Sequence, residues 1–238
     1  MKKAFVLTFR IILIVFLLLL VGFSSIELYK YNKGKFENRA LADTVVEKAE
    51  TEGEKISVDF DALLNENRDV IGWLYCEDTP INYAVVQAED NEKYLRRGID
   101  GKHSHSGSLF ADFRNSPDFA DKNTVIYGHN MNNSEMFGSL IRYKEEKYFD
   151  AHPELLLITP DKAYTLSLIA GFEEKSTAEF YENLVSFKNP EETVNSFIAK
   201  STFRSGYVFS EEDRFITLST CTDDYSDVRY LLIGKISQ

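Results

Sequence analysis

The chain has 238 residues, 44% hydrophobic and 13% aromatic, which is enough for one good-sized domain and an appendage. Its formal net charge is −11. Three positive residues, Lys2, Lys3 and Arg10, precede residue 26, so the rest of the chain carries −14. An acidic body of this kind excludes a nucleic-acid-binding protein, which needs a basic surface.

The first element in chain order is an apolar segment over residues 4–23, interrupted only by Thr8 and Arg10. About 20 helical residues span a hydrocarbon layer of ~30 Å. The positive residues near its start favour a cytoplasmic N-terminus and an extracellular body. We therefore predict a retained membrane anchor over residues 1–25. A cleavable signal peptide is the alternative, although no A-x-A-like cleavage site is present.

The next segment, residues 26–57, is polar and charged and is predicted to be a stalk leading away from the membrane. Residues 43–50 within it resemble a short helix. Asp59 is placed to cap a second helix whose apolar residues follow at helical spacing. One larger domain is predicted over residues 58–238.

Within this domain, short apolar runs are separated by turn residues. Eight of them are candidate strands: residues 70–75, 81–86, 107–111, 124–127, 155–159, 164–172, 214–219 and 228–236. Eight strands of this length with few helices between them predict a mainly β fold, a closed or nearly closed barrel.

Two helices are predicted between the strands. The first begins with Asn133 as its cap and presents an apolar face through residue 143. The second lies in a long connection, residues 173–207, and begins with Asn189 as cap and Pro190 at the first helical position. Long connections in compact domains are often functional.

Only two cysteines are present, Cys76 and Cys221. Cys221 closes one apolar strand and Arg229 opens the next one eight residues later. Nearby positive charge stabilises a thiolate, so Cys221 is a candidate nucleophile. Two structural explanations stay open: a disulfide between the cysteines, which an extracellular location permits, and a surface ion pair of Arg229 with Asp223, Asp224 or Asp227.

His129 is the histidine best placed to assist a nucleophile, because it ends a buried-looking strand. Gly128 is expected to let the chain turn sharply there, which would set the imidazole at the strand edge. A structural histidine is the equal alternative at this point. His103 and His105 form a pair without a third ligand, so no metal site is predicted. No cofactor is predicted either.

These residues lie in two motifs, Thr217-Leu-Ser-Thr-Cys221 with Arg229 and Asn123-Thr-Val-Ile-Tyr-Gly-His129-Asn-Met. The motifs resemble those of the sortases, membrane-anchored cysteine transpeptidases of Gram-positive bacteria. The resemblance covers residues 58–238 and is strongest to class B. Further class B-like stretches are residues 70–74, 83–87, 90–95, 107–112 and 136–140. The eight-residue interval from cysteine to arginine differs from the ten of some class B members.

The resemblance implies an eight-stranded sortase-type barrel with N-terminal helices and a helix inserted before the cysteine strand. Residues 58–238 would then be the catalytic domain. Carried over by position, Cys221 becomes the nucleophile, His129 the acid and base, and Arg229 the oxyanion stabiliser. The implied substrate-binding residues are Ser219, Thr220, Asn91, Leu95 and Tyr181.

The implied reaction is cleavage of a C-terminal sorting signal, an Asn-Pro- or Ser-Pro-type pentapeptide ending in Thr-Gly or Thr-Asn, after Thr. The acyl group would pass to an amine of peptidoglycan or its lipid-linked precursor, which anchors a surface protein. A cysteine hydrolase, a pilin-polymerising sortase and a non-enzymatic surface-binding domain are the alternatives. The pilin type is disfavoured because the chain ends at Gln238, directly after the last strand.

Overall fold

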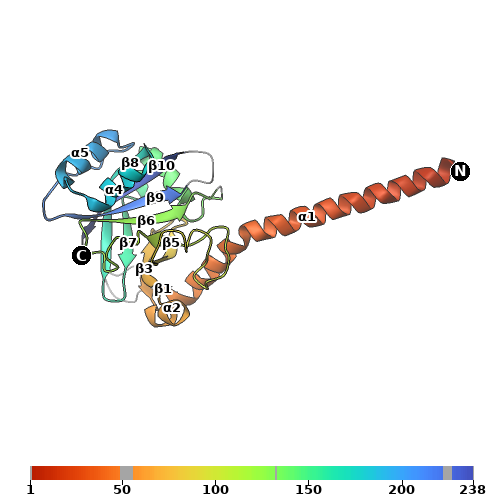
Figure 1. The fold of residues 1–238 in the computed structure, drawn as a ribbon, viewed down its shortest axis with the longest axis horizontal. Coiled ribbons are helices and arrows are strands. Elements are labelled where there is room, and N and C mark those ends of the chain that lie inside the picture. Colours follow the sequence, from red (N-terminus) through yellow and green to blue (C-terminus); the bar gives the residue numbers. More distant parts are fainter. Residues whose placement is uncertain (1, 49–55, 132, 222–226, 238) are drawn as a thin grey trace.

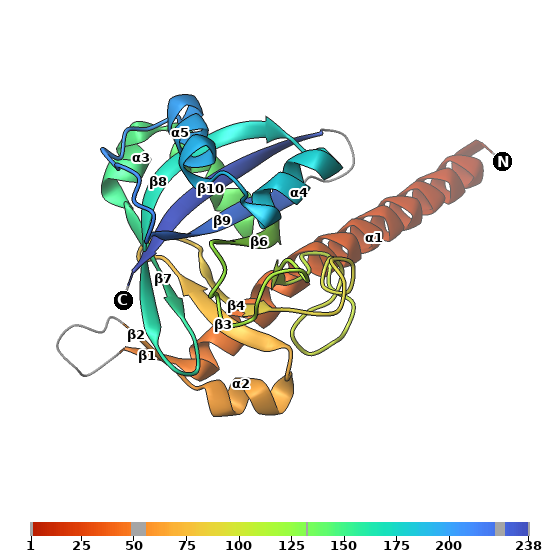
Figure 2. The same cartoon turned by 60° about the vertical axis from the view of Figure 1, so that its left-hand side comes forward.

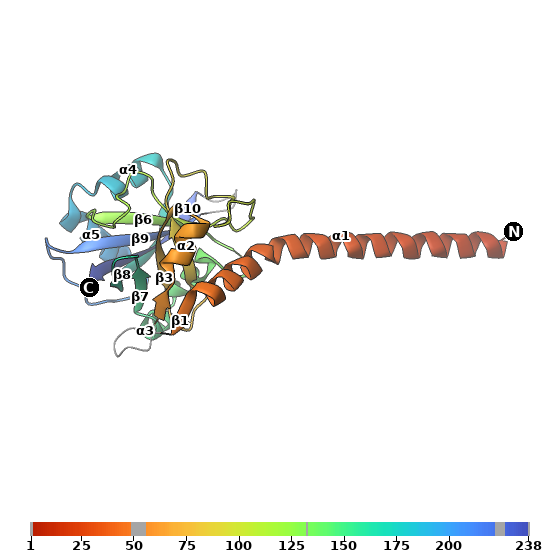
Figure 3. The ribbon, with the colours of Figure 1, turned by 90° about the horizontal axis from the view of Figure 1, so that it is seen from below.

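The computed structural model describes residues 2–48, 56–131, 133–221 and 227–237. A long helix, α1 (Lys2–Val45), runs from the N-terminus to a β-barrel, and most of its length projects away from that barrel (Figure 1). The turned views show the same separation, with the last turns of α1 packed beside the barrel (Figures 2 and 3).

Eight strands form a closed barrel in the order β10-β8-β7-β3-β4-β5-β6-β9. This architecture confirms the predicted mainly β barrel. Two of its pairings, β4 with β5 and β6 with β9, are parallel. The strands are β3 (Val70–Tyr75), β4 (Asn82–Val86), β5 (Leu109–Ala111), β6 (Asn123–His129), β7 (Glu154–Ile158), β8 (Ala163–Lys175), β9 (Arg214–Cys221) and β10 (Val228–Ser237).

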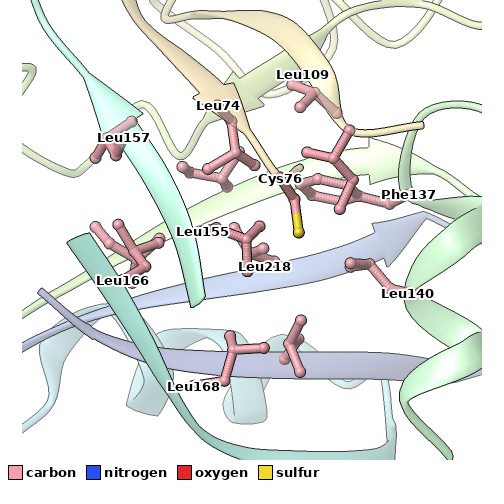
Figure 4. Close-up of a cluster of buried hydrophobic side chains, with 14 of the residues drawn as sticks. Leu74, Cys76, Leu109, Phe137, Leu140, Leu155, Leu157, Leu166, Leu168 and Leu218 are labelled. Carbon is pink, nitrogen blue, oxygen red and sulfur yellow. The ribbon is translucent and has the colours of Figure 1, made fainter. Parts of the chain in front are cut away.

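The barrel interior is filled by apolar side chains that alternate along the strands. Figure 4 shows leucines of several strands around Cys76, among them Leu74, Leu155 and Leu218. Cys76 itself is 2% exposed, and its sulfur donates to the carbonyl oxygen of Glu154 at 3.6 Å. It therefore behaves as a core residue.

Helix α1 has two dissimilar parts. From Val6 to Tyr29 it carries large apolar side chains that are exposed. Near its end, Ala42 and Val45 are buried against the barrel. The predicted short helix over residues 43–50 is wrong over residues 46–48, because the chain there forms β1 (Val46–Lys48) and pairs with β2 (Ile56–Val58). Residues 49 and 50 lie outside the described part of the chain. Pairing with a strand that lies later in the chain overrides local helix propensity.

Helix α2 (Phe60–Glu66) begins where predicted, because the Asp59 carboxylate accepts a hydrogen bond from Ala62 N at 2.9 Å. The helix expected after Asn133 begins later. It is a 3₁₀ helix, η1 (Phe137–Lys144), followed by α3 (Glu146–Ala151). Asn133 instead accepts from Glu135 N at 3.2 Å, which holds a turn rather than a helix start.

The connection between β8 and β9 contains two helices where the sequence predicted one. Helix α5 (Pro190–Lys200) begins after Asn189 as expected, although the Asn189 side chain makes no capping hydrogen bond. Helix α4 (Ala178–Ser186) was missed. Its cap was readable, since the Thr177 hydroxyl accepts from Phe180 N at 3.1 Å. Asn123 Nδ2 donates to the carbonyl of Leu184 at 2.8 Å and fastens α4 to β6.

Candidate active site

The C-terminal ends of β6 and β9 meet at one edge of the barrel. These strands are parallel, and their register sets His129 opposite Cys221, with Gly128 opposite Thr220. Residues that face each other in a parallel pair have neighbouring backbones. Two residues that are 92 positions apart in the sequence are thus brought together by one strand pairing.

Arg229 joins this edge through the next strand pair. Strands β9 and β10 are antiparallel, with Leu231 opposite Ser219, so the same register continued by two residues sets Arg229 opposite Cys221. Thr220 fastens this end of the pair: its hydroxyl accepts from Tyr230 N at 3.0 Å and donates to Tyr230 O at 3.3 Å.

The guanidinium of Arg229 is partly enclosed. Its Nη1 is buried and has no hydrogen-bond partner among the residues that the structure describes. Of its three suggested surface partners, Asp223 and Asp224 lie outside the described residues, and no ion pair to Asp227 occurs within the described part. A guanidinium donates five N–H groups in a rigid fork, so a buried Nη1 at this edge is chemically suited to bind an oxyanion.

The imidazole of His129 is held by the segment before β5. His129 is 4% exposed, and its Nε2 lies 2.7 Å from the carbonyl oxygen of Leu95. Because a carbonyl only accepts, Nε2 carries the proton when the ring is neutral. Leu95, predicted as a substrate contact, thus also orients the histidine through its backbone.

Two glycines near this edge allow neighbouring groups to pack closely. The prediction of a turn at Gly128 is wrong, because β6 continues through it to His129. A Cβ at Gly128 would lie 2.4 Å from Leu109 Cδ2, so close packing requires the glycine. Gly107 has φ +58°, and a Cβ there would lie 2.6 Å from the Leu95 carbonyl oxygen. It lets the Leu95 segment approach.

The remaining predicted contacts lie on two segments that touch this edge: the Leu95 segment contacts His129, and α4 contacts Ser219. Asn91 is on the segment before β5, where its Oδ1 accepts from Phe113 N at 3.0 Å. Tyr181 is on α4, and its hydroxyl lies 2.8 Å from Ser219 Oγ. Ser219 is fully buried beneath that contact. We refer to the Asn91–Leu95 segment as the first wall of the candidate site and to α4 as its second wall.

A third group of residues at the site was not predicted. The ring of Tyr127 on β6 packs against the ring of Tyr181 with centroids 5.6 Å apart. Its hydroxyl donates to Asp112 Oδ2 at 2.8 Å, and Asp112 also binds Arg114. The sequence did carry a signal, because Asp112 directly follows an apolar strand and a carboxylate there needs a partner.

The chain matches the family model of the sortase domain over residues 74–237. It is 35% identical over 175 residues to sortase B of Listeria monocytogenes, covering 71% of this chain and 70% of that protein. The structure is similar to a Staphylococcus aureus sortase B–substrate complex, with a TM-score of 0.70, 28% identity and coverage of 75% and 84%.

A Streptococcus pyogenes class B sortase involved in pilus biogenesis is similar too, with a TM-score of 0.68, 35% identity and coverage of 76% of this chain and 98% of that one. Together with these matches, the barrel and its cysteine edge identify a cysteine transpeptidase. The chain belongs to the sortase family, and its relatives place it in class B.

Proposed function

We propose that the protein cleaves a C-terminal sorting signal after Thr and transfers the acyl group to a cell-wall peptide amine. The signal would be an Asn-Pro- or Ser-Pro-type pentapeptide ending in Thr-Gly or Thr-Asn. The observation that carries this proposal is the strand register that gathers His129, Cys221 and Arg229 at one edge. The similar Staphylococcus aureus structure is described as a sortase B–substrate complex, which supports a substrate-binding role for this chain.

In this proposal the Cys221 thiolate attacks the carbonyl carbon of the signal's Thr, and the carbonyl oxygen gains negative charge. Arg229 donates hydrogen bonds to that oxygen. His129, as imidazolium, gives a proton to the departing amine, so the peptide C–N bond breaks and a thioester remains. The acceptor amine then attacks the thioester, His129 takes back a proton, and the thiolate leaves as the new amide forms.

The proposed location of the reaction rests on α1. Among the described residues, α1 is a helix long and apolar enough to cross a membrane, a property that signal sequences near an N-terminus share. We propose that it is retained as an anchor over residues 1–25, with Lys2, Lys3 and Arg10 favouring the cytoplasmic side. The domain over residues 58–238 then works outside the cell on surface proteins.

A pentapeptide library incubated with the full chain in detergent tests the proposed function. We expect cleavage after Thr in a subset of Pro-containing peptides and, with an added amine, a peptide–amine product. Cys221→Ala should reduce turnover by about 10³-fold or more with the fold unchanged, because the nucleophile is gone. Arg229→Ala should cost about 10²–10³-fold in kcat. Turnover retained in Cys221→Ala would exclude the proposed nucleophile.

A pilus-type function is the second candidate, supported by the similar streptococcal class B sortase. The two functions differ in the amine that resolves the thioester. A lysine side chain of a pilin subunit would serve the second, and a cell-wall peptide amine the first. Competition between the two amines in the same assay, followed by mass spectrometry of the products, separates them and also reveals hydrolysis by water.

A further inference from the structure

Asp112 is a fully buried carboxylate at the end of β5. Its Oδ1 accepts from Arg114 N at 3.0 Å and from Arg114 Nε at 2.8 Å. Its Oδ2 accepts from Arg114 Nη2 and Tyr127 OH, both at 2.8 Å, and from Asn91 Nδ2 at 3.0 Å. A buried charge is tolerated when it is paired and its remaining lone pairs are filled, and both conditions hold here.

Two of these donors belong to the site. Asn91 lies on the first wall, and its side chain bridges from Asp112 to Phe113 N. Tyr127 packs against Tyr181 of the second wall, and Tyr181 in turn contacts Ser219 beside the cysteine strand end. Asp112 therefore binds Asn91 of the first wall, and it also binds Tyr127, which packs against Tyr181 of the second wall.

Arg114 extends the same connection to helix α4. While Nε and Nη2 bind Asp112, Nη1 donates to Glu182 Oε2 at 2.8 Å. Glu182 follows Tyr181 directly, and its side chain is 66% exposed. The planar guanidinium is suited to this double contact because its donors point in fixed directions.

From this geometry we propose that Asp112 is a positioning residue of the peptide groove. It acts through Asn91, Tyr127 and Arg114 and sets the separation between the Asn91–Leu95 segment and α4. Peptide affinity then depends on Asp112 although it does not touch the peptide. The inference rests on the proposed function, since it assigns the two walls to the sorting signal.

A purely structural role makes a different prediction. Were Asp112 only a stabilising ion pair, its loss would lower the melting temperature and leave the KM of the folded enzyme unchanged. A positioning residue raises KM for the peptide in the folded enzyme, because both walls must be ordered again on binding. The split between KM and kcat therefore decides between them.

The test uses the full chain in detergent with the best-cleaved pentapeptide of the library. Asp112→Asn should raise KM for the peptide about tenfold with kcat within about twofold. Glu182→Ala, at an exposed position that is not expected to impair folding, should raise it about threefold. Glu179→Ala is the matched control, because Glu179 is an exposed carboxylate one turn earlier on α4, and it should leave both constants unchanged.

Binding of the same peptide to each variant in a Cys221→Ala background gives a second readout that does not need turnover. Weaker binding in Asp112→Asn and Glu182→Ala, with Glu179→Ala unchanged, supports the proposal. Unchanged KM and unchanged binding in folded Asp112→Asn would overturn it. If Asp112→Asn does not fold, Glu182→Ala alone decides: no change in KM or binding overturns the proposal. A wild-type enzyme that cleaves no peptide overturns the proposed function instead, so the two failures are distinct.

Discussion

Asp112 and Glu135 are two buried carboxylates that each accept a hydrogen bond from a buried tyrosine, but their positive partners have different origins. Asp112 is paired with Arg114, two residues away. Glu135, on the turn after β6, is paired with Lys35 at 2.9 Å and Arg39 at 3.4 Å, both on α1. The charge of Asp112 is thus neutralised by a neighbour in the sequence. The charge at Glu135 is neutralised only when α1 docks.

The tyrosines differ in the same way. Tyr127 donates to Asp112, whereas Tyr83 donates to Glu135 at 2.7 Å and also accepts from Met136 N at 3.0 Å. Burial, followed by the neighbouring carboxylate, raises the pKa of both phenols, so they stay protonated donors. Asp112 thus joins the two walls of the proposed peptide site, whereas Glu135 ties the helix of the proposed anchor to the barrel.

Replacing each carboxylate by alanine should produce the largest losses of stability, and the loss should be larger at Asp112 than at Glu135. Asp112→Ala should lower the free energy of unfolding by about 3–5 kcal/mol, because Arg114 and the Tyr127 hydroxyl lose their buried partner. Glu135→Ala should cost less, about 1–3 kcal/mol, since Tyr83 keeps Met136 N and the lysine and arginine can reach water. Thermal unfolding of the full chain in detergent measures both. An equal or larger effect at Glu135 would contradict the comparison.

Removing the two cations of α1 should give an intermediate effect. Lys35→Ala with Arg39→Ala leaves Glu135 buried without its charge partners, and we expect a loss of about 2 kcal/mol. In a Glu135→Gln background the same two substitutions should lower the free energy of unfolding only slightly. A double-mutant cycle measures this difference. Lys33→Ala is the control, because its pair with Glu37 on the same helix is exposed and worth at most about 0.5 kcal/mol. A cycle without coupling would show that α1 docks independently of Glu135.

The smallest expected effect is on the fall of the melting temperature in acid. Burial raises the pKa of the Asp112 carboxyl, but the hydrogen bonds from Arg114, Tyr127 and Asn91 outweigh it and place the pKa below the ordinary value of 3.8. A lowered folded-state pKa adds stability that is complete above 3.8 and is lost as the pH falls through the lower value. The fall in melting temperature from about pH 5 to pH 2 should therefore be shallower in Asp112→Asn than in wild type. Glu179→Gln should keep the wild-type slope.

The sequence predicted the eight barrel strands well, because each is a short apolar run bounded by turn residues. It predicted where α2 and α5 begin for local reasons too: Asp59 caps α2, and Pro190 stands at the first helical position of α5. It was wrong where distant contacts decide: β1 forms after Val45 because β2 pairs with it, and Gly128 is required by packing rather than by a turn.

The residues of the candidate site also fall into those that the sequence predicted and those that it did not. Cys221, His129 and Arg229 were selected from their motifs, since strand ends and residue chemistry are visible in sequence. Asp112, Arg114 and Tyr127 were not, because nothing in a linear sequence says that Asn91 and α4 will meet one buried carboxylate. Helix α4 was not predicted either, so Tyr181 was selected as a contact without the helix on which it lies.

The sequence by itself determined the class of fold, the apolar N-terminal helix and the residue types able to perform acyl transfer, because periodicity and residue chemistry are local properties. The tertiary structure decided which of those residues share an edge and what holds them there. Strand register brings His129 opposite Cys221, and one buried charge holds the two walls. Both result from contacts between residues far apart in the chain, which local patterns do not encode.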